Sequence, residues 1–158
     1  MQPAVKRFSL ILAILCLTLA GCGSTASSPP VANLPTVQMA IGKSDFTLEV
    51  ADNAAKREQG LMQRDSMPSS HGMIFVFPDE TDRAFWMKNT RIPLDIVFLD
   101  HNGKIVSLAT MKPYDLSNTP SNGPAKYAIE LNAGEIQSLG LQVGQILSIP
   151  TGASSTKE

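Results

Sequence analysis

The sequence has 158 residues with 13 basic and 14 acidic side chains, so its formal net charge is −1. Lys and Arg are dispersed along the chain and form no basic stripe interleaved with aromatic residues, which argues against a nucleic-acid partner. The length is sufficient for one compact domain with its own hydrophobic core and short for two.

The first residues have the three-part pattern of an export signal. Lys6 and Arg7 form a positive n-region, an apolar run of 13 residues follows over Phe8–Ala20, and small residues close the segment. This run is shorter than the roughly 20 residues that a membrane-spanning helix needs. The sequence therefore predicts a removable signal peptide over residues 1–21.

Leu19-Ala20-Gly21-Cys22 resembles the lipobox of bacterial lipoproteins. The resemblance implies that Cys22 becomes the first residue of the mature chain and carries lipid on its sulfur. Each buried methylene contributes about 0.8 kcal/mol, so two or three acyl chains would hold the protein durably on a membrane. We expect a protein anchored in the cell envelope, and Gly23 after the cysteine favours the outer membrane where two membranes exist.

Cleavage before Cys22 leaves no other cysteine in the mature chain. The protein then has neither a disulfide nor a free thiol nucleophile. Zinc would need three or four protein ligands, and His71 and His101 are the only histidines. We expect no metal site and no cofactor.

Residues 22–36 are rich in Ser, Pro and Ala and nearly uncharged, a composition that predicts a flexible tether. The domain is expected over residues 37–150, and the polar tail, residues 151–158, is expected to be disordered.

Within the domain, Phe46–Val50 alternates apolar and polar residues, as a half-buried strand does. A short helix is expected over Ala54–Gln59, with Asp52 or Asn53 as the N-cap and Gly60 as the left-handed stop.

Short apolar runs bounded by Pro, Gly, Asp or Asn predict the remaining strands. They are Met73–Phe77, Ala84–Met87, Ile96–Leu99, Ile105–Leu108, Tyr127–Leu131 and Gln145–Ile149. The segment Asp100-His101-Asn102-Gly103 predicts a tight hairpin turn, and a second short helix is expected between Gly134 and Leu139. Many short strands with little helix indicate a mainly β fold, a compact and mostly antiparallel β-sandwich or barrel-like single domain with one or two short helices.

Four segments together resemble the family called domain of unknown function 192. They are Gly60–Arg64, Gly72–Pro78, Phe85–Thr90 and Pro93–Asp100. The resemblance extends from about Phe46 to Ile149 and implies a small, mainly β, sandwich-like domain that is often exported and sometimes lipidated. It implies no established biochemical activity, so function must be inferred from the residues.

Trp86, Asn89 and Asp95 form the densest group of candidate binding residues. In a strand, Trp86 would point away from the core that its neighbours face, and an exposed Trp can stack on a sugar ring. Asn89 and Asp95 would then supply hydrogen bonds, with Arg64 as a further polar anchor. The alternative is structural: Trp86 in the core, and Asn89 and Asp95 bonded to the loop backbone.

Arg57 and Arg64 are expected to need a carboxylate where they are buried. Asp95 or Glu130 would supply it, and we favour such a structural ion pair over an arginine that grips a ligand.

These patterns predict a non-catalytic, envelope-anchored binding module for a small polar or glycan ligand or for a protein partner. One alternative is a hydrolase that uses Asp95, Asp100 or Glu130 as acid and base. The other is a copper-handling protein, because thioethers and imidazole bind Cu(I), although methionine also fills irregular cores. The candidate methionines are Met62, Met67, Met73, Met87 and Met111.

Overall fold

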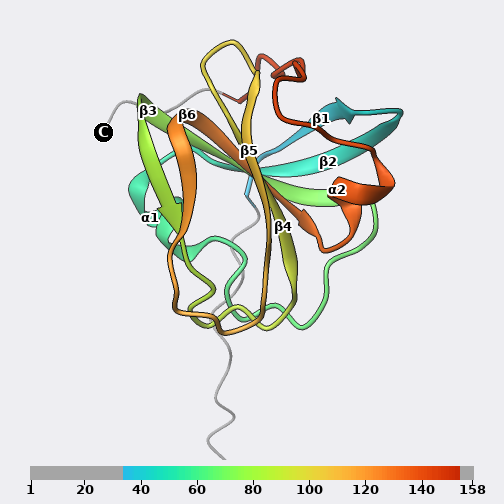
Figure 1. Ribbon diagram of the computed structural model, residues 1–158. Coiled ribbons are helices and arrows are strands. Elements are labelled where there is room, and N and C mark those ends of the chain that lie inside the picture. The colour runs from blue at the N-terminus through green and yellow to red at the C-terminus, as the bar shows by residue number, and fades with distance from the viewer. Residues whose placement is uncertain (1–33, 154–158) are drawn as a thin grey trace, which may run out of the picture. The chain divides into compact units, whose positions relative to one another are not determined.

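The computed structural model describes residues 34–153 (Figure 1). The predicted signal peptide and Cys22, together with most of the tether and the tail, lie outside these residues. The strands are β1 (Thr36–Ile41), β2 (Ser44–Ala51), β3 (His71–Phe85), β4 (Leu94–Leu99), β5 (Ile105–Met111) and β6 (Thr119–Asn132). The helices are α1 (Ala54–Gln59) and α2 (Glu135–Ser138).

The strands form one sheet in the order β1-β2-β3-β6-β4-β5. Every neighbouring pair is antiparallel except β2 and β3, which are parallel. The prediction of a mainly β, mostly antiparallel single domain with two short helices is therefore confirmed. Two adjacent parallel strands need a connection that returns the chain to the end of the sheet where the first strand began. Between β2 and β3, α1 and residues 60–70 form this connection.

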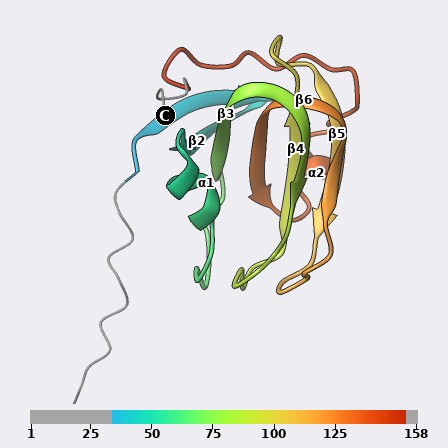
Figure 2. The same ribbon diagram turned by 90° about the vertical axis from the view of Figure 1, so that its left-hand side faces the viewer.

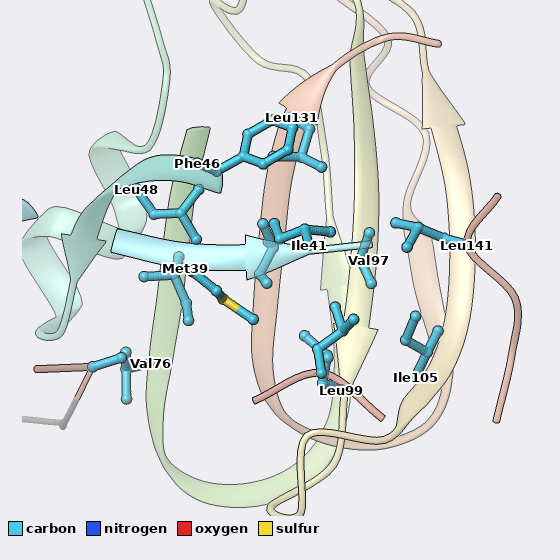
Figure 3. Close-up of a cluster of buried hydrophobic side chains, with 14 of the residues drawn as sticks. Met39, Ile41, Phe46, Leu48, Val76, Val97, Leu99, Ile105, Leu131 and Leu141 are labelled. Carbon is cyan, nitrogen blue, oxygen red and sulfur yellow. The ribbon is translucent and has the colours of Figure 1, made fainter. Parts of the chain in front are cut away.

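The sheet bends strongly, so that β1 and β2 run across the direction of β4 and β5 (Figure 1). Figure 2 shows the long β3 arching over the top of the domain. Register shifts interrupt the β3–β6 pairing after Val76 and after Asp82, and such bulges increase local bend and twist. The result is a barrel-like curl in which β1 lies over the face of β3, β6 and β4 (Figure 3).

Apolar side chains cover both faces of the sheet, and the central strands are buried on both sides. All six residues of β4 are buried. The inner core, inside the curl, includes Met39, Ile41, Leu48, Val76, Val97, Leu99 and Leu131 (Figure 3). The outer core, on the opposite face, includes Leu61, Met73, Phe75, Met87, Ile96, Phe98 and Met111.

Local signals in the sequence placed α1 and the β4–β5 hairpin correctly. The Asn53 side chain accepts a hydrogen bond from the Lys56 backbone N–H at 3.0 Å, which makes Asn53 the N-cap. Gly60 ends the helix with a φ of 46°, and its N–H donates to the Lys56 carbonyl at 2.9 Å. In the hairpin, Gly103 has a φ of 76°, as the tight turn requires.

Two expectations about strands are wrong. Met73–Phe77 and Ala84–Met87 were expected as separate strands, but β3 is continuous over both and ends at Phe85. Gln145–Ile149 is no strand, since it contributes only an isolated bridge between Ile146 and Lys104. Backbone hydrogen bonds join this segment to residues 103–105, at the start of β5, and Gly144 has a φ of 90° at the turn.

At the N-terminal end of the domain, β1 begins at Thr36 and was not predicted as a strand. Four of its six residues are apolar, but only Met39 and Ile41 are buried. Ala153, in the predicted tail, is buried against the inner core.

Asp95 joins three elements in the interior. Its side chain accepts hydrogen bonds from the Thr110 hydroxyl at 2.6 Å and from the backbone N–H groups of Gly134 and Ile136 at 2.9 and 2.8 Å. Asp95 is 1% exposed and caps α2 from outside, because the helix's own N-cap, Gly134, has no side chain to do so.

Replacement of Asp95 by Ala should lower the free energy of unfolding by about 3–5 kcal/mol, because it leaves buried backbone donors without acceptors. Urea denaturation of the full chain measures this loss. Asp100→Ala is the matched control, since Asp100 also accepts two backbone hydrogen bonds but lies at the exposed hairpin turn. If Asp95→Ala costs no more than Asp100→Ala, the structural role of Asp95 is wrong.

Candidate functional site

A small pocket opens between the β2–β3 crossover and the outer face of the sheet. Its volume is about 40 Å³, which is room for a few water molecules or one small chemical group. The crossover supplies residues 57–62, β3 supplies Phe75 and Phe85, the loop after β3 supplies Trp86 and Thr90, and β6 supplies Glu130.

Glu130 is the acidic group at the inner end of this pocket. It pairs in register with Met73 of β3 on one side and with Ile96 of β4 on the other, so its neighbours in the sheet are apolar. Its side chain is 5% exposed. Within residues 34–153 its carboxyl group makes no hydrogen bond or ion pair, and its oxygens are not fully sealed from solvent, since Ser107 Oγ is the only fully buried side-chain N or O atom there without a partner.

Burial raises the pKa of Glu130 from 4.5 to about 8, and the attraction of Arg64 opposes this rise. In such surroundings, desolvation destabilises the charged carboxylate by more than the attraction of a distant cation stabilises it. Glu130 is therefore largely protonated at neutral pH and can donate as well as accept a hydrogen bond.

The two arginines near the pocket are engaged by other groups. Arg64 forms a two-pronged ion pair with Glu49 of β2, with N–O distances of 2.5 and 2.7 Å. Arg57 donates to the Val76 carbonyl at 2.9 Å, and its guanidinium lies 5.4 Å from the centre of the Phe77 ring. The expectation that Asp95 or Glu130 is the carboxylate for Arg64 is thus wrong: β2 brings Glu49 beside the crossover instead.

Trp86 forms part of the pocket wall and is 47% exposed. It lies just past the end of β3, where Met87 turns inward and is buried. The opposite orientation of the two side chains matches the expectation, although neither residue belongs to a strand. The Lys88 ammonium lies 5.0 Å from the centre of the Trp86 ring. Behind it, Phe85 packs edge-to-face on Phe75 with ring centres 4.9 Å apart, which fixes the pocket floor.

Of the four residues that the sequence proposed for ligand binding, the structure places only Trp86 in the pocket wall. Arg64 influences the site through its charge, on Glu130. Asn89 has a φ of 55°, and its carbonyl accepts from the Gln63 N–H, so its backbone shapes the loop. Asp95 is buried and bonded elsewhere, outside the pocket lining.

The sequence indicates Glu130 only as an ion-pair partner or a catalytic acid. The signal that marks it is its position between Ile129 and Leu131 in an apolar strand, where an acid is uncommon. That signal gains meaning only once β6 is known to be a central strand with both faces covered.

Three of the five candidate methionines lie in the hydrophobic core. Met73, Met87 and Met111 are at most 3% exposed and belong to the outer core. Among the described residues, no group of three or more His, Cys, Asp or Glu side chains is placed to hold a metal ion.

Comparison with known proteins places this chain in a family. Residues 37–149 match the family model of DUF192, which is described as an uncharacterised ACR. The chain belongs to the DUF192 family. A UPF0127 protein of Pyrococcus furiosus is 36% identical over 99 residues, which cover 61% of this chain and 81% of that relative.

Solved structures share the DUF192 fold. A Sinorhizobium meliloti protein, described as a candidate transcription regulator, matches with a TM-score of 0.67 and 36% identity over 72% of this chain and 91% of its own. A protein of unknown function from Novosphingobium aromaticivorans matches with a TM-score of 0.69 and 31% identity over 76% and 89% of the two chains.

The titration of Glu130 makes the stability of the DUF192 domain depend on pH. Because the folded state raises this pKa, the folded chain holds the proton more tightly than the unfolded chain does. The contribution of Glu130 to stability is therefore most favourable below pH 4.5 and declines by roughly 1.4 kcal/mol per pH unit until about pH 8.

Replacement of Glu130 by Gln removes this titration and should stabilise the domain by more than about 2 kcal/mol at pH 8, with little effect at pH 4. Urea denaturation of the full chain at the two pH values measures the difference. Glu58→Gln, at an exposed position of the same pocket, should change stability by less than about 0.5 kcal/mol at either pH. An effect of Glu130→Gln that is equal at pH 4 and pH 8 would contradict the buried titration.

Proposed function

We propose that this protein is a lipid-anchored envelope protein whose DUF192 domain binds a small polar ligand in the pocket of Glu130 and Trp86. The observation that carries this proposal is the buried Glu130 carboxyl, which faces a solvent-connected pocket and has no hydrogen-bond partner within residues 34–153. Membrane anchoring rests on the lipobox resemblance at Cys22.

An acid in this position lowers stability at neutral pH, and an apolar or amide side chain of similar size would avoid that loss. Functional sites often contain a titratable group that lies in a cleft and lowers the stability of the protein. The group that satisfies Glu130 is therefore best supplied by a ligand.

The dimensions of the pocket limit what the ligand is. A volume of about 40 Å³ accepts one functional group, so the remainder of the ligand would lie outside, against Trp86. The half-exposed indole offers a flat apolar surface for that remainder. This geometry suits a small polar molecule or one substituent of a larger glycan.

The description of the Sinorhizobium meliloti relative as a candidate transcription regulator raises nucleic acid as a partner. The charge pattern of this chain does not favour it. Arg64, Arg83 and Arg91 are each paired with a carboxylate, which leaves them poorly available to phosphates. Over residues 34–153 no helix is long and apolar enough to cross a membrane.

A thermal screen of the full chain should test the binding site. Monosaccharides, amino acids and small envelope fragments are the compounds, and a ligand present at 100 times its Kd stabilises by about 2.7 kcal/mol, which shifts Tm by several degrees. Trp86→Ala should abolish the shift. Tyr114→Ala is the matched control, since Tyr114 is a 59% exposed aromatic residue outside the pocket lining and should leave the shift intact. A screen with no shift, or an equal loss in both variants, would contradict the proposed site.

Replacement of Cys22 by Ser should release the protein from the membrane fraction, because no acyl chains can then be attached. Fractionation of cells and metabolic labelling with a radioactive fatty acid measure the effect. Retention of the variant in membranes at the wild-type level would show that another segment provides the anchor.

A further inference from the structure

We infer that the pocket binds a primary ammonium group, with Glu130 as its counter-ion and the ring of Trp86 beside its stem. This inference rests on the proposed function and specifies its ligand class. The juxtaposition that points to it is a buried acid, a second acid at the rim and aromatic rings around one small opening.

The pocket-lining groups without an ion-pair partner among the described residues are carboxyl groups. Glu58 and Glu130 both line the pocket, and neither forms an ion pair with any residue in 34–153. The nearby cations have partners: Arg64 is held by both oxygens of Glu49, and Arg57 by the Val76 carbonyl and the Phe77 ring. An anion would meet two carboxyl groups there, whereas a cation would meet acceptors that lack donors.

The pocket also favours a cation by its aromatic surfaces. Phe75, Phe85 and Trp86 contribute to the lining, and the faces of aromatic rings attract ammonium groups. The Trp86 ring already holds one at 5.0 Å, that of the exposed Lys88, which is not itself a lining residue. A ligand ammonium would therefore have the ring of Trp86 on one side and the carboxyl oxygens of Glu130 ahead of it.

Hydrogen-bond donors select among cations. The pocket has room for an –NH₃⁺ group, and a trimethylammonium group carries no N–H that could donate to Glu130. Three N–H donors also match the free acceptors of Glu130. A primary ammonium can come from a diamine, an amino sugar or an amino acid side chain, and these sources share the group that the pocket recognises.

Binding would involve the transfer of one proton to solvent. The ligand retains its ammonium proton, and Glu130 releases its carboxyl proton to become the counter-ion. The other groups near Glu130 are the attractive Arg64, the pocket-lining Arg57 and Glu58, and the apolar Met73 and Ile96 on the adjacent strands. Because Glu130 is protonated at neutral pH, affinity should rise about tenfold from pH 6 to pH 7 and level off above pH 8.

The single tryptophan of the chain makes the test direct, since all indole fluorescence comes from the pocket wall. The full chain in detergent micelles is titrated with 1,4-diaminobutane, glucosamine and lysine at pH 6, 7 and 8. Glucose and N-acetylglucosamine serve as neutral comparisons, and tetramethylammonium serves as a cation without N–H donors. We expect a fluorescence change with at least one primary amine, the stated pH dependence, and release of one proton in calorimetry with two buffers of different ionisation enthalpy.

Glu130→Gln should weaken the amine at least tenfold at pH 8, while Glu135→Gln, a matched acid on α2 away from the pocket, should leave the affinity unchanged. Circular dichroism confirms that both variants are folded. Which amine binds most tightly identifies the source of the group.

Two results would overturn the inference in different ways. If N-acetylglucosamine or glucose binds as well as glucosamine and Glu130→Gln still removes binding, the pocket takes a neutral ligand: the ammonium assignment fails and the proposed function stands. If amines bind but Glu130→Gln has no effect, the amine lies elsewhere and both fail.

Discussion

The parallel pairing of β2 and β3 is the constraint on which the rest of this structure depends. Two adjacent parallel strands require the chain to cross from one end of the sheet to the other. The crossing segment, α1 and residues 60–70, lies over the outer face, which would otherwise expose the apolar side chains of β3 and β4. The crossing is only partly packed, since α1 has no buried residue and only Leu61 enters the core deeply. The pocket is the space left beneath it.

The ion pair of Arg64 with Glu49 has two roles in this arrangement. It fastens the crossing segment to β2 with two charge-assisted hydrogen bonds. It also places a neutralised guanidinium close enough to attract Glu130 but engaged by another carboxylate. The fold thus buries the acid without pairing it within residues 34–153, and the resulting loss of stability arises beside the pocket opening.

Predictions from sequence succeeded where the determining interactions are local. The N-cap of Asn53, the stop at Gly60 and the Asn102-Gly103 turn depend on residues within four positions of one another, so their patterns are sufficient. The extent of β3 was not predictable, because its second half is held by pairing with β6 about 40 residues later.

The sequence by itself determined the class of fold, the short local elements and the family, and it selected Trp86, which lines the pocket. Only the tertiary structure decided the roles of the acids. Asp95 and Glu130 look alike in sequence, since each lies beside apolar residues in a strand. The fold surrounds Asp95 with three donors from two distant segments and leaves Glu130 facing an opening. The role of a buried carboxylate depends on which hydrogen-bond donors reach it. Long-range packing, and not the neighbouring residues in the chain, decides which donors do so.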